Sequence, residues 1–83
     1  MRNDEFIRKI DNASEMVFSV NGERFTVCDE NEKGISIAQW NMPDTERYFS
    51  SAEDLINEYQ IDGKPVKEWA ESIRIDDYTG FDA

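Results

Sequence analysis

The chain has 83 residues, of which 19 are acidic and nine are basic, so its formal net charge at pH 7 is −10. A surface with this charge repels phosphate backbones and anionic lipids, which argues against direct binding to nucleic acid or to a membrane. The length fits a single domain over residues 1–83, and the lone cysteine excludes an intramolecular disulfide framework.

The N-terminal half is expected to contain a short helix and a β-hairpin. The helix should cover residues 3–11, where three apolar side chains share one face. The Asn21-Gly22 pair lies between two β-prone segments and favours a two-residue type I′ turn, because both central positions need positive φ. Such a turn sets Phe18 opposite Phe25 and gathers five apolar side chains on the core face of the hairpin. These are Met16, Phe18, Val20, Phe25 and Val27.

Further strands should extend the hairpin into a small antiparallel sheet. A third strand is expected over residues 35–40, after a polar turn. Residues 41–45, which include a proline, should then interrupt the chain. Residues 46–49 would add a short fourth strand at the edge, which gives the sheet three or four strands.

Two helices are expected after the strands. Ser50 and Glu53 have the spacing of a capping box, which indicates a second helix that ends near Tyr59. Pro65 suits the first turn of a third helix, since apolar residues then recur with helical spacing. The predicted fold is therefore α+β, with helices packed on one face of the sheet in the order α-β-β-β-(β)-α-α. Residues 76–83 are expected to form an acidic tail, whose order the sequence leaves open.

No catalytic or metal-binding constellation can be assembled from these residues. Without histidine, the chain lacks the commonest general base and the commonest transition-metal ligand. A single thiol, Cys28, cannot form a cysteine zinc site. The segment from Asp29 matches a calcium loop only in part, because Lys33 and Trp40 stand where oxygen ligands are required. We therefore expect a protein that is not an enzyme and has no cofactor and no metal site.

The remaining candidates are surface residues that could bind a partner. Carboxylates near the hairpin and along the later segments could form a band with phosphate-like spacing, to which the Lys and Arg of a nucleic-acid-binding groove would bind. Aromatic residues among charges are typical interface anchors. For each of these residues the alternative is a solvated charge or a ring in the core. The acidic candidates are Asp29, Glu30, Glu32, Glu53, Asp54, Glu58, Glu68, Glu71, Asp76 and Asp77, and the aromatic candidates are Trp40, Tyr48, Tyr78 and Phe81.

Two segments carry a resemblance to a known group of proteins. Phe49-Ser50-Ser51-Ala52-Glu53-Asp54-Leu55 followed by Ile61-Asp62-Gly63-Lys64-Pro65-Val66 resembles small acidic proteins of Firmicutes phages and mobile elements. In those proteins a helix, a hydrophobic-Asp-Gly-Lys turn and a second helix close an α/β unit. The chain is also similar in size, acidity and lack of catalytic residues to anti-CRISPR proteins and other DNA-mimic inhibitors. The resemblance implies a phage or mobile-element protein that acts by binding.

Three functions are compatible with these features. The first is a non-enzymatic inhibitor, such as an anti-CRISPR protein, whose acidic surface occludes the basic surface of a nucleic-acid-binding protein. The second is an adaptor or structural protein, monomeric or weakly dimeric, that associates with other chains or with itself through a sheet edge. The third is an immunity protein for a basic nuclease. In all three the acidity could also serve only to keep a small domain soluble.

The expected location is the cytoplasm of a bacterial or phage-infected host cell. The N-terminal residues lack the apolar core of a signal peptide, and no apolar run approaches the ~18 residues needed to cross a bilayer. A secreted domain of this size would usually need disulfides.

Overall fold

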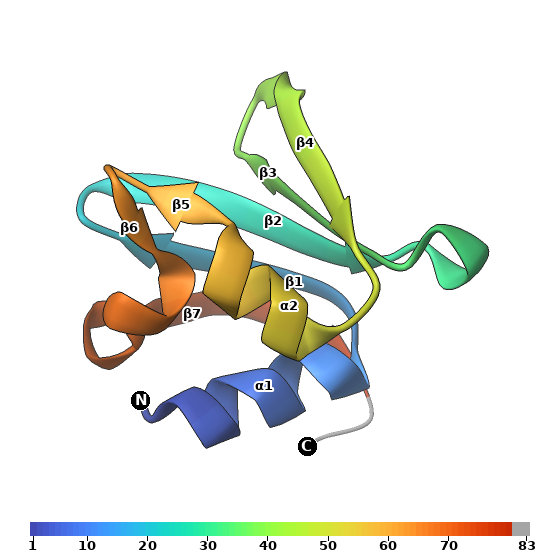
Figure 1. The fold of residues 1–83 in the computed structure, drawn as a ribbon, viewed down its shortest axis with the longest axis horizontal. Helices are drawn as coiled ribbons and strands as arrows, with labels where there is room; N and C mark the ends of the chain where they lie inside the picture. The colour runs from blue at the N-terminus through green and yellow to red at the C-terminus, as the bar shows by residue number, and fades with distance from the viewer. Residues whose placement is uncertain (81–83) are drawn as a thin grey trace.

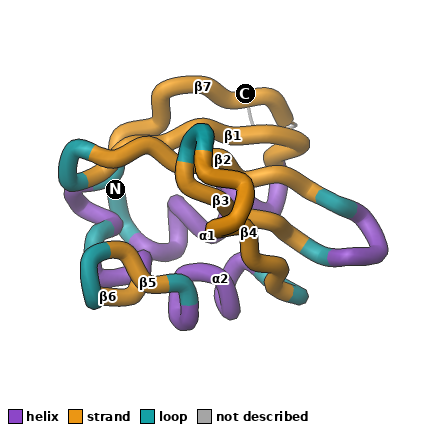
Figure 2. The backbone as a smooth tube through the Cα atoms, turned by 90° about the horizontal axis from the view of Figure 1, so that it is seen from above, coloured by secondary structure: helices purple, strands orange, loops and turns teal. Residues whose placement is uncertain are grey.

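The computed structural model describes residues 1–80, and it combines one antiparallel sheet with a layer of helices. Both α-helices, α1 (Asn3–Asn12) and α2 (Ala52–Glu58), lie on the same side of the sheet (Figure 1). In Figure 2, which views the molecule from above, the helices and the small β5–β6 hairpin lie on one side of the sheet. The α+β class is therefore confirmed, but the main sheet has five strands in the order β4-β3-β2-β1-β7, where three or four were expected. The strands are β1 (Ala13–Val20), β2 (Glu23–Asp29), β3 (Ile35–Gln39), β4 (Met42–Phe49), β5 (Gln60–Ile61), β6 (Lys64–Pro65) and β7 (Arg74–Gly80).

The predicted hairpin forms as the sequence indicates. Asn21 and Gly22 have φ angles of 54° and 78°, which are the positive values that a type I′ turn requires. Phe18 lies opposite Phe25 in the β1–β2 ladder. All five apolar side chains expected on the core face are buried, so the turn has set the register of the whole sheet.

The core lies between this face of the sheet and the helices. Phe18 is fully buried at its centre, where its ring meets Phe6 of α1 edge-on, with centroids 5.4 Å apart. On the other side it stacks on Phe25 at 5.3 Å. Leu55 and Ile56 close the core from α2. In a chain this short, these few aromatic contacts supply a large share of the apolar burial.

The sequence predicted an interruption of the strands at residues 41–45, but the structure has none there. Strand β4 begins at Met42, because a tight turn at Asn41 (φ 61°) returns the chain directly from β3. The hydroxyl of Thr45 accepts a hydrogen bond from the backbone N–H of Gln39 at 2.8 Å, where the register shifts. Pro43 is tolerated because β4 is an edge strand, where a missing N–H leaves no sheet partner unsatisfied.

The second helix is confirmed, with its cap shifted by one residue. Ser51, not Ser50, is the N-cap, and its hydroxyl accepts a hydrogen bond from the backbone N–H of Asp54 at 3.1 Å. Ser50 donates instead to the carboxylate of Asp54 at 2.9 Å. Asp54 therefore takes part in ordering the first turn of α2.

The prediction of a third helix is wrong. After the β5–β6 hairpin the chain forms two short 3₁₀ turns, η2 (Val66–Glu68) and η3 (Ala70–Ser72). Of the apolar residues with helical spacing, Val66, Ala70 and Ile73 are buried and Trp69 is partly buried, because successive 3₁₀ turns, with three residues per turn, direct the same positions inward. Trp69 stabilises this arrangement, because its indole N–H donates to the carbonyl of Ile61 at 2.8 Å.

Residues 76–80 of the expected acidic tail are part of a strand. Strand β7 pairs antiparallel with β1 and places Tyr78 opposite Met16 and Ile75 opposite Phe18. A register shift between these pairs sets the two inward-facing residues three positions apart. The sequence therefore lacks the alternation of apolar and polar residues that would predict a regular strand. Phe81 lies outside the described residues.

Two glycines allow a direct test of backbone geometry. A Cβ atom at Gly34 (φ +96°) would lie 2.3 Å from the carbonyl oxygen of Phe49, whereas a Cβ at Gly22 (φ +78°) would have no atom within 4 Å. We predict that Gly34→Ala lowers the free energy of unfolding by about 2 kcal/mol or more, because a steric clash adds to the cost of positive φ. Gly22→Ala should cost about 1 kcal/mol from φ alone. Chemical denaturation measures both, and equal losses would contradict the close approach of Gly34 to the carbonyl of Phe49.

Candidate functional site

The structure divides the ten acidic candidates into three groups and does not join them into one band. One group lies on α2 and the two 3₁₀ turns, a second on the loop between β2 and β3, and the third on β7. Figure 1 places the β2–β3 loop and the η2–η3 turns at opposite ends of the molecule. The helix group is Glu53, Asp54, Glu58, Glu68 and Glu71, the loop group is Asp29, Glu30 and Glu32, and the strand group is Asp76 and Asp77.

The helix group gives the largest number of exposed carboxylates. Glu53 and Glu58 lie on α2, and Glu68 and Glu71 lie on η2 and η3; α2 and η2 are in contact. We call these four residues the helix-layer acidic surface. Within residues 1–80, none of the four forms an ion pair within 4 Å. Asp54 is half-buried and occupied with the cap of α2, so it is left out of this surface.

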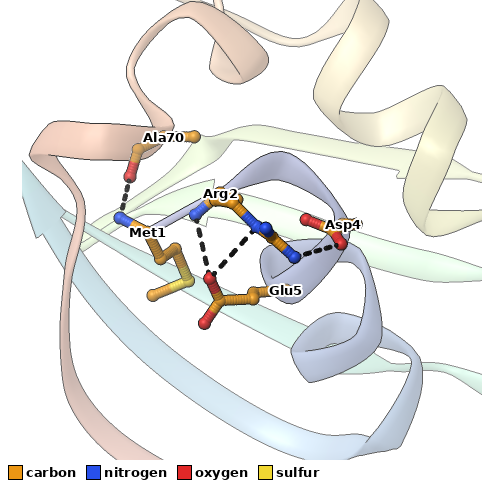
Figure 3. Close-up of polar contacts among 5 residues, drawn as sticks. All are labelled: Met1, Arg2, Asp4, Glu5 and Ala70. Carbon is orange, nitrogen blue, oxygen red and sulfur yellow. Dashed lines mark hydrogen bonds and ion pairs between the residues drawn. The ribbon is translucent and has the colours of Figure 1, made fainter.

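Two cations lie near one part of the helix-layer acidic surface. A hollow of about 340 Å³ is lined by Arg2 and Lys67 as well as by Glu68 and Glu71. Arg2 is already engaged, because its guanidinium contacts Asp4 at 2.9 Å and also Glu5 (Figure 3). The adjacent N-terminal amine donates to the carbonyl of Ala70 at 2.9 Å. Arg2 and the N-terminal amine therefore contact other parts of the chain, whereas Lys67 forms no ion pair within residues 1–80.

The loop group is held by backbone hydrogen bonds around a 3₁₀ turn, η1 (Asn31–Lys33). The backbone N–H of Glu30 donates to the carbonyl of Gly34 at 2.8 Å. Glu30 and Glu32 are exposed, and so is Asp29, which has an interaction of its own. These three carboxylates form a small acidic end, well separated from η2 and η3.

Asp76 has an internal role that the sequence did not reveal. It lies between two arginines, with Arg74 Nε at 3.0 Å from one carboxylate oxygen and Arg24 Nε at 3.7 Å from the other. Partial burial would raise the pKa of Asp76, but hydrogen bonds from Ser19 and Arg74 outweigh it and hold that pKa below its ordinary value. Asp76 is thus a neutralised, structural carboxylate.

The aromatic candidates also separate into two kinds. Trp40 and Tyr48 are 45% and 43% exposed, as an interface anchor would be, and so is Met42 at 47%, which the sequence did not single out. Tyr78 packs against the core and donates its hydroxyl hydrogen to the carbonyl of Lys9 at 3.0 Å. Its contact with α1 therefore contributes to the fold.

Four of the nine basic side chains lie over aromatic rings. Arg24 stands 5.8 Å from the centroid of Trp40, and Lys33 stands 5.9 Å from that of Tyr48. Lys64 lies 4.3 Å from Trp69, and Lys9 covers Tyr78 at 4.9 Å. Except for Lys64 and Trp69, the two members of each pair are far apart in the sequence, so the fold brings them together. Their effect is that the positive charges are used within the molecule.

The single thiol gives no sign of nucleophilic reactivity. Cys28 is half-buried on the sheet face that points away from the helices. Burial, together with the carboxylates of Glu15 and Glu30, raises the pKa of its thiol. A raised pKa keeps the thiol protonated at neutral pH, and the thiolate is the reactive form.

Arg24 and Arg74 line an open hollow at the β1–β2 turn. Its volume is about 650 Å³, and Trp40, Ser72 and Asn21 also line it. Sequence reasoning missed this group because Arg74 lies at the start of β7, which was not predicted as a strand. The alternation of Arg24 with the buried Phe25 was the only local signal.

Three further findings concern the chain as a whole. Residues 1–80 contain no group of three or more cysteine, aspartate or glutamate side chains arranged to hold a metal ion. Within the same part of the chain, no helix has the length and hydropathy needed to cross a membrane. No protein-family model, curated protein or solved structure matches the chain.

A carboxyl pair connects two tight turns at the edge of the core. Asp62, in the β5–β6 turn, accepts a hydrogen bond from the side-chain amide of Asn21 at 2.5 Å. Glu23 accepts a 3.5 Å hydrogen bond from Gln39. Partial burial and the neighbouring Asp62 raise the pKa of Glu23 above its ordinary value of 4.5. Protonated Glu23 thus favours the fold; that contribution is complete below about pH 4.5 and is lost as the pH rises through the folded-state pKa.

We predict that Glu23→Gln raises the melting temperature at pH 7, because it removes the repulsion between two ionised carboxylates. The gain over the unmodified chain should shrink as the pH falls to 4, where Glu23 takes up its proton. Thermal denaturation followed by circular dichroism between pH 4 and 7 measures this trend. Glu58→Gln removes an exposed carboxylate on α2 and serves as the control. The same pH trend in both variants would rule out a specific Glu23–Asp62 contact.

Proposed function

We propose that this chain is a non-enzymatic binding protein that occludes a basic, nucleic-acid-binding surface of another protein. The helix-layer acidic surface would make the contact, with Lys and Arg of the partner binding to Glu53, Glu58, Glu68 and Glu71. In this role it would act as an inhibitor of the kind carried by phages and mobile elements, and an anti-CRISPR protein is one form of it.

The observation that carries the proposal is the unequal use of the two kinds of charge. At least seven of the nine basic side chains are engaged inside the molecule. Four lie over rings. Arg2 and Arg74 form ion pairs, and Arg47 donates to backbone carbonyls at Asp44 and Glu46. The four carboxylates of the helix-layer acidic surface have no such ion pair within residues 1–80. They are therefore available to the cations of a partner.

Electrostatic attraction is the expected source of both rate and selectivity. The carboxylates lie on a short helix and two turns near it, so several negative charges are held close together, as they are in a phosphate backbone. Charged patches of opposite sign speed association and exclude wrong partners, and both effects weaken with ionic strength. The inhibitor would act by occupying the surface that nucleic acid needs.

The main test compares two sets of charge-neutralising substitutions. Affinity capture from a bacterial lysate at about 50 mM and 500 mM salt would identify proteins that bind only at low salt. We predict that the quadruple variant Glu53→Gln, Glu58→Gln, Glu68→Gln, Glu71→Gln binds the captured protein about tenfold more weakly or worse, since each exposed ion pair contributes about 0.2–1 kcal/mol. The captured protein should also lose its nucleic-acid binding when the unmodified chain is added.

The matched control removes four carboxylates from α1, β1 and β4. The variant Asp11→Asn, Glu15→Gln, Asp44→Asn, Glu46→Gln has the same net charge as the test variant, and its affinity should fall much less. Equal losses in the two variants would mean that only total charge matters, and the proposed surface would be wrong. If a single nuclease were captured, the chain would be an immunity protein that uses the same surface.

A second candidate, an adaptor or structural protein that associates through a sheet edge, is favoured by the exposure of Met42 and Tyr48 on edge strand β4. Pro43 and the charges of β4 oppose strand pairing with another chain. Under this alternative, sedimentation at rising protein concentration should show a dimer that persists in high salt. Met42→Asp should then shift it to monomer, whereas Asn57→Asp on α2 should not. A monomer at all concentrations would exclude self-association.

A further inference from the structure

The hollow at the β1–β2 turn contains an arrangement of arginines that the proposed function does not use. Arg24 comes from β2, and Arg74 begins β7, two strands away across the sheet. Asp76 binds both of them through the Nε atom. One carboxylate thus fixes two guanidinium groups beside the same open space of about 650 Å³.

The position of Asp76 leaves the outer edges of both guanidinium groups available. No hydrogen bond within residues 1–80 uses an Nη atom of Arg24 or Arg74, although the guanidinium of Arg24 also stands 5.8 Å from the ring centroid of Trp40. The two side chains are 52% and 78% exposed. An arginine edge with two Nη groups is well shaped for the oxygens of a carboxylate or a phosphate, and holding Nε in advance reduces the entropy lost on binding.

The rest of the lining would contact the body of such a ligand. The indole of Trp40 lines the hollow, and the residue is 45% exposed, so the part of the indole that Arg24 does not cover offers a flat surface for a ring. Ser72 and Asn21 add neutral polar groups. The volume is within the range of small-molecule sites and exceeds the volume that a lone phosphate would fill.

The local charge also favours an anion, although the chain as a whole is strongly negative. Two guanidinium groups share the single carboxylate of Asp76, which leaves one positive charge. Glu23 also lines the hollow, but strand alternation directs it to the opposite face of β2 from Arg24, where it meets Gln39. The neighbours of its carboxylate are Gln39 and Asp62.

We propose that this hollow is a binding site for a small molecule in which a phosphate or carboxylate is joined to a flat ring. The Nη groups of Arg24 and Arg74 bind the oxyanion, and the ring packs on Trp40. The site uses none of the four carboxylates of the helix-layer acidic surface, and its ligand has the opposite charge from the partner proposed for that surface.

The test uses four probes and the two tryptophans of the chain. Titration with AMP and with benzoate, followed by the indole N–H resonances, should shift Trp40 saturably with a Kd below about 1 mM. Trp69, whose indole is bonded to Ile61, is the internal reference and should not move. Adenosine, which lacks the anion, and inorganic phosphate, which lacks the ring, should bind at least about tenfold more weakly. The tighter of the first two probes identifies phosphate or carboxylate as the preferred anion.

Four variants separate directed binding from simple charge attraction. Arg24→Lys and Arg74→Lys keep the charge but lose the two-pronged edge, and each should weaken binding about tenfold. Arg74→Gln should weaken it at least as much. Arg47→Gln, on β4, changes net charge equally and should leave the affinity unchanged. The proposal is overturned if neither AMP nor benzoate shifts Trp40 saturably up to about 10 mM, or if all variants bind alike.

Discussion

The chain of aromatic contacts through Phe18 is the constraint on which the rest of the structure depends. Phe6 and Phe25 contact Phe18 on its two sides, and Tyr59 continues the chain from Phe25 to Phe49. Such pairs add about 0.5–1.5 kcal/mol each beyond the area they bury. With so few residues, only one side of the sheet can receive a layer of helices. The other face stays open, and that is why Arg24 and Asp76 can meet there.

The one-sided core also explains how the charges are distributed. Rings that the core does not enclose, such as Trp40 and Tyr48, are covered instead by the stems and cationic heads of Arg24 and Lys33. Each contact contributes roughly 0.5–1 kcal/mol at an exposed site. Arg24 and Lys33 therefore pack on the surface aromatic residues. Because the acidic residues outnumber the basic ones by about two to one, the chain cannot supply one cation for every carboxylate.

The parts of the fold that depend on local chemistry could be predicted from the sequence, and those that depend on distant contacts could not. The Asn21-Gly22 turn fixed the register of β1 and β2 because its positive φ values are a property of two residues. The spacing of Val66, Trp69 and Ala70 suits an α-helix and two 3₁₀ turns equally well, so it misled. Strand β7 exists because β1 offers a free edge, which no local pattern reports. The same holds for the candidate site: the acidic residues could be identified from the sequence, but the arginine partners of Asp76 could not.

Asp76 shows why the number of acidic residues alone does not define an acidic binding surface. In the sequence it is equivalent to Asp77 or Glu68, yet in the fold it binds two guanidinium groups and contributes little free negative charge. Neutralising it would change the local net charge by one, and it would also release two arginine side chains from the contact that holds them. The same substitution on α2, at Glu53, would remove one solvated carboxylate and nothing else. A map of the acidic surface by mutation must therefore be built on the carboxylates that have no internal partner.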